Sequence, residues 1–129
     1  MANRLRGMDV VPDGILTSSA KRAKQTAKTF REALGVSKEN VIVREELYHA
    51  WPDAIEAQVR QLPDSWQTVL VFGHNPGFTE LANRLINHQF IGNVPTCGIT
   101  AASIELKSWA SFELAAATRV AYLYPKQVV

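Results

Sequence analysis

The stretch "WQTVLVFGHNPGFTELANRLI", residues 66–86, decides how this chain folds. Its first part is a continuous apolar run, which is typical of a strand buried on both faces of a parallel sheet. The run ends at Gly73 and His74. Asn75 and Pro76 follow as a helix cap and a first helical residue, and apolar residues then recur at helical spacing. The stretch therefore predicts a buried strand, a turn and an amphipathic helix.

The same order of strand and helix occurs upstream in "DGILTSSAKRAKQTAKTFREALG", residues 13–35. A short apolar run precedes apolar residues spaced three and four apart, and Gly35 is typical of a helix end. We expect these further elements: a strand over 40–47, a helix over 50–63, and two closing strands over 99–106 and 118–125 that form a hairpin at the sheet edge. The alternation of strands and helices predicts an α/β fold.

The composition limits the chain to one domain. Its 129 residues, 47% of them hydrophobic, suffice for one ordinary core, so we expect a single domain over 1–129. The apolar runs are far shorter than the roughly 20 residues of a membrane span. The first residues lack the apolar stretch of a secretory signal, and Cys97 has no partner for a disulfide within the chain. These features predict a cytoplasmic protein without a membrane anchor.

The charge is distributed unevenly along the chain. Residues 1–36 hold seven bases and three acids, and the remainder holds seven bases and nine acids. Helix-turn-helix and zinc-finger spacings are absent, and no aromatic residues interleave with the bases, so we expect no nucleic-acid partner. The three histidines lack metal-ligand spacing and no glycine-rich phosphate loop occurs, so we expect no metal and no cofactor. Lys28 and Arg31 fit an ordinary solvated helix face.

Three cations, Lys21, Arg22 and Lys24, stand at the start of the helix predicted within 13–35. Each costs a few tenths of a kcal/mol at an exposed helix start, where the macrodipole is already positive. An anion bound there removes this cost, and a guanidinium matches two oxygens of a phosphate or sulfate ion. We expect Arg22 to bind such an ion, with Ser18 or Ser19 capping the helix. The alternative is a solvated lysine-rich turn.

His74 stands at the end of the strand predicted within 66–86. Ligands collect beyond the carboxyl ends of parallel strands, so His74 and Arg22 can converge on one anion. An arginine and a histidine around an anion suit phosphoryl transfer, in which positioning and charge stabilisation dominate. The alternative is a histidine that hydrogen-bonds a neighbouring loop.

The two junctions together resemble a known family. "SSAKRAKQTA" is similar to the Ser-Ser-x-x-Arg-Ala-x-Gln-Thr segment of the histidine phosphatase superfamily, and "VFGHNPG" resembles its second histidine motif. With "ELYHAWPD" and "VPTCG", the chain looks most like the SixA-type phosphohistidine phosphatases, from about residue 2 to 125. The resemblance implies a three-layer, phosphoglycerate mutase-like sandwich with a mostly parallel sheet.

The resemblance also implies roles for individual residues. Arg22 matches the arginine that clamps the phosphoryl group, and Ser18 lies at the phosphate-facing strand end. His74 matches the second histidine, which stabilises the transferring oxygens. The family's Leu-x-Glu acid corresponds to "LYH", residues 47–49, which makes His49 a candidate proton donor, with Glu46 and Asp53 as alternatives. The implied substrate is a phosphohistidine protein or a small phosphoester.

One family segment has no match in the sequence. The family begins with a strand ending in Arg-His-Gly, whose histidine is the nucleophile, but no Arg-His-Gly occurs here. "ANRLRG", residues 2–7, looks like the end of the helix after that strand, so we expect an N-terminally truncated domain whose first strand is missing. The strands next to the missing strand would be left with unpaired backbone N–H and C=O groups, and each such group costs about 1–3 kcal/mol when buried. Another chain could supply the strand, or the exposed edge could form a homo-oligomer.

Three functions follow from these expectations. The first is a phosphohistidine phosphatase whose nucleophile lies outside this chain. The second is a non-catalytic module that holds a phosphoryl group at Arg22 and His74. The third is a strand-deficient fragment that oligomerises through its open sheet edge.

Overall fold

Helices and strands alternate along most of the chain. The computed structural model describes residues 2–95 and 98–124. Its elements in chain order are α1 (Ala2–Gly7), β1 (Gly14–Ser18), α2 (Lys21–Leu34), η1 (Lys38–Asn40), β2 (Val41–Arg44), η2 (Glu45–Leu47), α3 (Pro52–Val59), β3 (Val69–Phe72), α4 (Gly77–Arg84), β4 (Ile99–Ser103), η3 (Trp109–Ser111), η4 (Leu114–Ala116) and β5 (Thr118–Leu123), where η denotes a 3₁₀ turn. None of the helices in the described residues is long and apolar enough to cross a bilayer.

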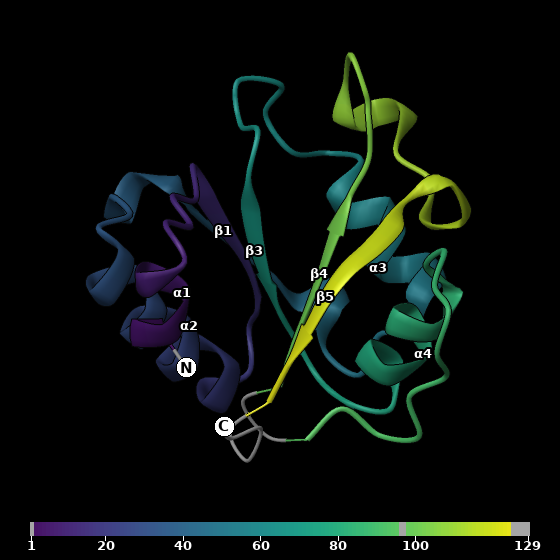
Figure 1. The fold of residues 1–129 in the computed structure, drawn as a ribbon. Helices are drawn as coiled ribbons and strands as arrows, with labels where there is room; N and C mark the ends of the chain where they lie inside the picture. The colour runs from purple at the N-terminus through teal and green to yellow at the C-terminus, as the bar shows by residue number, and fades with distance from the viewer. Residues whose placement is uncertain (1, 96–97, 125–129) are drawn as a thin grey trace.

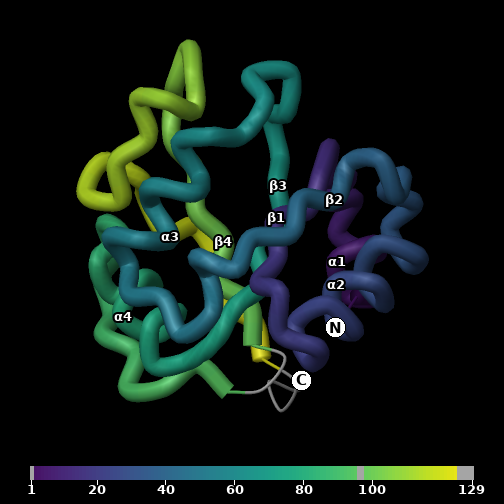
Figure 2. Tube along the Cα trace, turned by 180° about the vertical axis from the view of Figure 1, so that it is seen from behind, coloured from purple at the N-terminus to yellow at the C-terminus, as the bar shows by residue number. Residues whose placement is uncertain are grey.

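The strands form a central layer between two layers of helices (Figure 1). A parallel sheet has the order β2-β1-β3, and β4 and β5 form a separate antiparallel pair. Helices α1 and α2 lie beside β1 and β3, and α3 and α4 lie on the other side of the strands. The view from behind shows β2 next to β1 (Figure 2). The predicted α/β class and three-layer sandwich are confirmed.

The first strand and helix agree closely with their prediction. β1 is buried at all five positions, and α2 ends before Gly35, whose φ of 73° is left-handed. Glycine adopts that conformation without the steric cost that a Cβ brings. The strand predicted over 40–47 is shorter, because Glu45–Leu47 turn as η2 after Arg44. The apolar residues of 40–47 were evident in the sequence, but the 3₁₀ turn at Glu45–Leu47 was not.

The burial predicted for β3 is wrong. All four of its residues are half-buried, whereas β1 is fully buried. The difference follows from pairing, because β1 has a strand on each side and β3 is paired with β1 alone in the described part of the chain. The prediction that residues 69–72 form a strand is right, but one edge of this strand pairs with no other strand among the described residues.

The C-terminal strands pair as predicted but are not joined by a tight turn. β4 and β5 are antiparallel, with an irregularity between Ala101 and Ala102. The connection between them contains η3 and η4 and returns across α3. Leu114 and Phe112 of this connection are buried in the main core. The connection therefore serves as a packing element.

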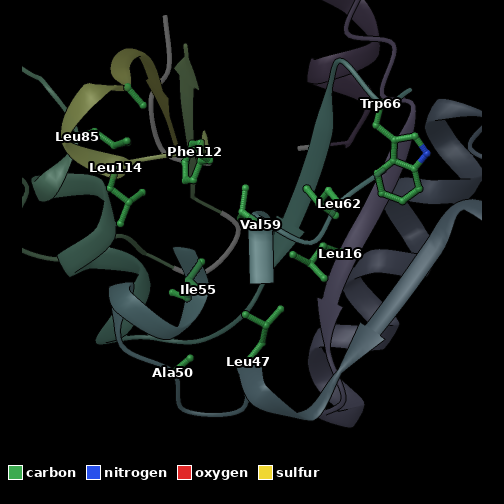
Figure 3. Close-up of a cluster of buried hydrophobic side chains, with 11 residues drawn as sticks. Leu16, Leu47, Ala50, Ile55, Val59, Leu62, Trp66, Leu85, Phe112 and Leu114 are labelled. Carbon is green, nitrogen blue, oxygen red and sulfur yellow. The ribbon is translucent and has the colours of Figure 1, made fainter. Parts of the chain in front are cut away.

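The main core lies between the parallel sheet and the α3 layer (Figure 3). Leu47 is 0% exposed and Ile55 is 1% exposed, so η2 and α3 are anchored firmly beneath the loop that joins them. A smaller cluster of Ala2, Leu5 and Phe30 fills the other side, between α1 and α2. Burying a leucine, isoleucine or phenylalanine side chain contributes about 1.5–3 kcal/mol. Both ends of the 48–51 loop are therefore fixed by packing.

Asp13 joins the segment before β1 to the segment before β3, at the end of the sheet opposite the carboxyl ends of these strands. Its Oδ2 accepts hydrogen bonds from the backbone N–H groups of Gln67 at 2.7 Å and Thr68 at 2.9 Å. The bond from Thr68, and then that from Gln67, lowers the pKa of the Asp13 carboxyl below its ordinary value. The ionised carboxylate is therefore the form that fastens the segment before β3 to the segment before β1.

We expect Asp13→Asn to lower the free energy of unfolding by about 1 kcal/mol near pH 7, a value reduced for solvent exposure. The pKa of Asp13 is lower in the folded state than in the unfolded state. The carboxylate therefore stabilises the folded protein fully at pH values above the unfolded-state pKa, and this stabilisation is lost as the pH falls through the folded-state pKa. Urea unfolding from pH 7 to pH 2 should show a smaller acid-dependent loss in the variant. Asp9→Asn is the control, and an equal effect there would contradict the assignment.

Candidate functional site

The carboxyl ends of β1 and β3 bring two predicted residues into contact. Ser18 is the last residue of β1, and His74 lies two residues beyond the end of β3. Because the strands are parallel and adjacent, both ends lie at the same sheet edge. Ser18 Oγ and His74 Nε2 are 2.9 Å apart, and Ser18 is 0% exposed. The hydroxyl donates to a neutral Nε2 or accepts from a protonated one.

The start of α2 lies directly against this contact. The backbone N–H of Ala20 donates to Ser18 Oγ at 3.2 Å. Ala20 itself is the N-cap residue, and no side chain caps the helix. The prediction that Ser18 or Ser19 caps α2 is therefore wrong, because β1 carries the chain straight into the helix through Ala20. The first N–H groups of α2 keep their capacity to bind an anion.

Arg22 projects from the first turn of α2. Its side chain is exposed and makes no hydrogen bond or ion pair with any residue in 2–95 or 98–124. Lys21 and Lys24 are exposed as well, and the first turn contains no acid. Ser18 and Arg22 are thus four residues apart across a strand-to-helix junction. The guanidinium retains all its donors for a ligand.

Asn75 fixes the loop that carries His74. Asn75 Oδ1 accepts from the backbone N–H of Thr79 at 3.1 Å and from its hydroxyl at 2.9 Å. Asn75 Nδ2 donates to the carbonyl of Val94 at 2.7 Å. The N-cap of α4 is Pro76 rather than the predicted Asn75, and α4 begins at Gly77. Asn75 lies one position before the N-cap residue, and its side chain nevertheless accepts a hydrogen bond from an N-terminal N–H of α4, that of Thr79.

His49 approaches His74 from the loop after η2. Its φ of 54° is left-handed, and its ring centroid is 5.6 Å from that of His74. The ring of Tyr48 contacts both, at 4.5 Å from His49 and 5.4 Å from His74. The loop is held because α4 passes directly beneath it: a Cβ on Gly77 would lie 1.9 Å from the carbonyl oxygen of Ala50. The two imidazoles are therefore held near each other by packing.

The surroundings of His74 favour its neutral form. Burial lowers the pKa of its imidazole, and the nearby charge of His49 lowers it further. A bound anion would act in the opposite direction, because it stabilises the imidazolium. Anion binding at this site should therefore be accompanied by proton uptake at His74.

We expect His49→Gln to raise the pKa of His74, because the variant removes a positive neighbour while burial stays in place. NMR titration of the imidazole signals measures this pKa directly. His88→Gln is the control, since His88 is exposed. Equal pKa values of His74 in the two variants would show that His49 exerts no electrostatic effect there.

The other two candidate proton donors, Glu46 and Asp53, are engaged elsewhere or exposed to solvent. Glu46 is exposed on η2, and Asp53 forms an ion pair with Arg84 at 2.9 Å. Neither makes a hydrogen bond or ion pair with His74 within the described ranges. Cys97 lies outside the described residues. Across those residues, no group of three or more His, Cys, Asp or Glu side chains gathers as metal ligands would.

The sequence did not reveal Tyr48 and Thr79 as parts of the site. Tyr48 is adjacent to His49 in "ELYHAWPD", which is the one signal that could have indicated it. Thr79 is a helix residue whose hydroxyl accepts from the N–H of Val94 at 2.9 Å, a contact between distant segments. Local spacing could not predict that contact.

Comparisons with known proteins identify the fold. No protein-family model and no curated protein matches the sequence. A solved structure assigned as the phosphohistidine phosphatase SixA from Nakamurella multipartitia matches with a TM-score of 0.74 and 27% identity, over 97% of this chain and 77% of that chain. The corresponding protein from Agrobacterium tumefaciens matches with a TM-score of 0.74 and 20% identity, over 96% of this chain and 75% of that chain.

A third match is the protein histidine phosphatase SixA complexed with tungstate, with a TM-score of 0.76 and 22% identity. It covers 95% of this chain and 74% of that chain. The two matches below 25% identity concern the fold, and all three agree on it. These matches show that the chain has the fold of the SixA phosphohistidine phosphatases, which are members of the histidine phosphatase superfamily.

Proposed function

We propose that Ser18, Arg22 and His74 bind the phosphoryl group of a phosphorylated substrate, and that this domain forms the phosphate-binding part of a phosphohistidine phosphatase. The observation that carries the proposal is the 2.9 Å contact of Ser18 Oγ with His74 Nε2. It lies at the sheet edge where α2 begins and Arg22 projects. The polar groups thus gather where parallel strands present their ligands.

Each group has a distinct task in this proposal. Arg22 donates two parallel hydrogen bonds to phosphoryl oxygens, and the N-terminus of α2 adds its positive end. His74 as imidazolium neutralises charge that builds on the transferring oxygens. His49 supplies a proton to the leaving group, with Glu46 and Asp53 as the alternatives. A phosphohistidine protein is the preferred substrate and a small phosphoester the second.

The covalent step needs a nucleophile that the 129 residues do not provide in the family's form, because they contain no Arg-His-Gly. In the proposed reaction, an imidazole nitrogen from another segment attacks phosphorus, and the bond from phosphorus to the substrate's nitrogen or oxygen breaks. The leaving group takes its proton from His49. Water then cleaves the new phosphorus–nitrogen bond, which releases inorganic phosphate and restores the imidazole.

The absence of Arg-His-Gly also favours a second candidate, a module that binds a phosphoryl group without turnover. Calorimetric titration of the chain with tungstate and with phosphate tests the binding shared by both candidates. A phosphohistidine peptide then separates them: the phosphatase hydrolyses it once a histidine-bearing segment is supplied, and the module does not. Failure of tungstate and phosphate to bind would refute both.

A further inference from the structure

Three cations on α2 form a row that borders the parallel sheet. Lys24, Lys28 and Arg31 are spaced four and three residues apart, so their side chains project from one side of the helix. Lys24 and Lys28 are exposed and Arg31 is half-buried, whereas Ala27, which precedes Lys28, is buried. The row therefore stands along the line where α2 meets the sheet.

A groove separates this row of cations from β2. Its cavity of about 110 Å³ is lined by Thr17, Lys24, Ala27, Lys28, Arg31, Val41 and Val43. Val41 and Val43 are two residues apart on β2, so both side chains lie on the face of the strand that is turned toward α2. One side of the groove is cationic and its floor is apolar. We call this hollow, defined by its seven lining residues, the α2–β2 groove.

The α2–β2 groove is accessible from the edge of the sheet. Among the described residues, β2 pairs with β1 alone and is the outermost strand of its sheet (Figure 2). Val43 is 43% exposed, although valine is among the residues that are most often buried. A segment of another molecule can therefore reach the cations and the valines from the side of β2.

The positive charge of the groove is not neutralised by the described part of the chain. Neither Asp nor Glu from the described residues lines it, and the ion pairs found in those residues lie on α3 and between α3 and α4. Arg31 Nη1 donates to the carbonyl of Val36 at 3.5 Å, which directs this guanidinium toward the end of α2. Carboxylates from a partner would therefore meet three cations without a competing acid.

We propose that the α2–β2 groove binds an acidic segment of the phosphoprotein substrate, an inference that rests on the proposed function and extends it. From Lys24 to Arg31 the row spans about 10 Å, at about 1.5 Å per helical residue. An extended chain rises about 3.3 Å per residue, so a run of roughly four Asp or Glu residues reaches all three cations. The carboxylates would meet the cations, and the methylene groups of glutamates would lie on the apolar floor.

The groove begins close to the proposed phosphate site. Lys24 lies two residues beyond Arg22 on α2, and Thr17 directly precedes Ser18 on β1. At about 3.6 residues per turn, Arg22 and the row of cations project from different sides of α2. A substrate chain that occupies both the site and the groove therefore crosses the start of the helix. Its acidic run would follow or precede the phosphorylated residue by a few positions.

An acidic protein segment fits the groove better than a nucleic acid or a second copy of this chain. Single-stranded nucleic acids bind to basic surfaces whose aromatic side chains stack on the bases, and none of the described residues that line the groove is aromatic. The longest run of acids in this chain is Glu45–Glu46, which is shorter than the row of cations requires.

The first test uses an unphosphorylated peptide with a run of four glutamates, and a peptide with four glutamines as its neutral counterpart. We expect the glutamate peptide to shift the NMR methyl signals of Val41 and Val43 and to leave those of Val120 unchanged, because Val120 lies on β5 away from the groove. The glutamine peptide should shift none of these signals. Equal shifts with both peptides, or equal shifts of Val120, would overturn the proposal.

The second test measures the affinity of the glutamate peptide by fluorescence anisotropy. The double variant Lys24→Glu, Lys28→Glu should weaken binding about tenfold, because two attractions become repulsions. The double variant Lys38→Glu, Lys107→Glu has the same net charge, and its two altered residues are exposed outside the groove. It should bind within about twofold of the parent protein. Equal losses in the two variants would reduce the binding to general charge attraction and overturn the proposal.

Two further variants test the apolar floor and do not change the cations. Val43→Asp places a carboxylate in the groove and should also weaken binding, whereas Val120→Asp, at an even more exposed valine, should not. If any variant does not fold, the methyl shifts of the unaltered chain decide. Tighter binding of a single-stranded RNA at Val41 and Val43, or a dimer in light scattering that covers these residues without peptide, would overturn the acidic-segment proposal.

The failure of this inference can be distinguished from that of the proposed function. Arg22→Ala should bind the unphosphorylated glutamate peptide as the parent does and lose tungstate. A phosphoserine added a few residues from the glutamates should tighten binding to the parent about tenfold and leave binding to Arg22→Ala unchanged. No gain in a parent that binds tungstate would overturn the placement of groove and site on one substrate chain.

Discussion

Replacing Arg22 with alanine should weaken tungstate binding about tenfold to a hundredfold. Hydrogen bonds to a charged group contribute about 1.5–3 kcal/mol, and a guanidinium offers two of them to one oxyanion. The side chain is exposed and makes no hydrogen bond or ion pair in 2–95 or 98–124 that its removal would break. The free energy of unfolding should therefore change by less than about 0.5 kcal/mol, as for other exposed positions.

Calorimetric titration of tungstate measures this loss, and the matched control is Lys28→Ala. Lys28 is an exposed cation on the same helix, more than a turn beyond Arg22. General attraction of an anion to a basic helix would be reduced similarly in both variants. A specific clamp loses affinity in Arg22→Ala alone, so equal losses would refute the proposed role of Arg22.

Binding should also strengthen as the solution becomes more acidic. The pKa of His74 is lowered in the free protein by burial and by His49, so its imidazolium is scarce at neutral pH. An oxyanion stabilises the imidazolium and raises that pKa. Affinity therefore rises as pH falls toward the lowered pKa, and the dependence disappears where His74 is already protonated in the free protein.

The sequence predicted the elements that local chemistry controls. The helix of Lys21–Leu34 follows from apolar spacing and from Gly35, and the strands follow from apolar runs. The sequence also predicted that Ser18 and His74 stand at strand ends, although it did not predict that the two side chains contact each other. These features depend on short spacings that the sequence displays directly.

Other features depend on contacts between distant segments, and the sequence did not display them. Burial of β3 depends on a neighbour strand at each edge, so an apolar run alone overstated it. Asn75 binds Thr79 and Val94 together, and only the folded chain brings Val94 there. The position of His49 relative to His74 likewise depends on how the 48–51 loop packs over α4.

That packing makes Gly77→Ala the substitution with the largest expected effect on stability. A Cβ at Gly77 would lie 1.9 Å from the carbonyl oxygen of Ala50, and this neighbour is backbone that cannot rotate away. Either α4 or the 48–51 loop must move. We expect the free energy of unfolding to fall by about 3 kcal/mol, the upper range for overpacking, and Tm to fall by roughly 10 °C.

Calorimetry measures the loss, and two other glycines provide a graded comparison. A Cβ at Gly73 meets the Phe78 ring at 2.4 Å, but that side chain can swing aside at moderate cost. Gly92 has nothing within 4 Å, so Gly92→Ala should stay within about 0.5 kcal/mol of the parent. Moving the loop also withdraws His49, so Gly77→Ala should raise the pKa of His74 as His49→Gln does. A stable Gly77→Ala protein with an unchanged pKa at His74 would show that the loop does not hold the two imidazoles together.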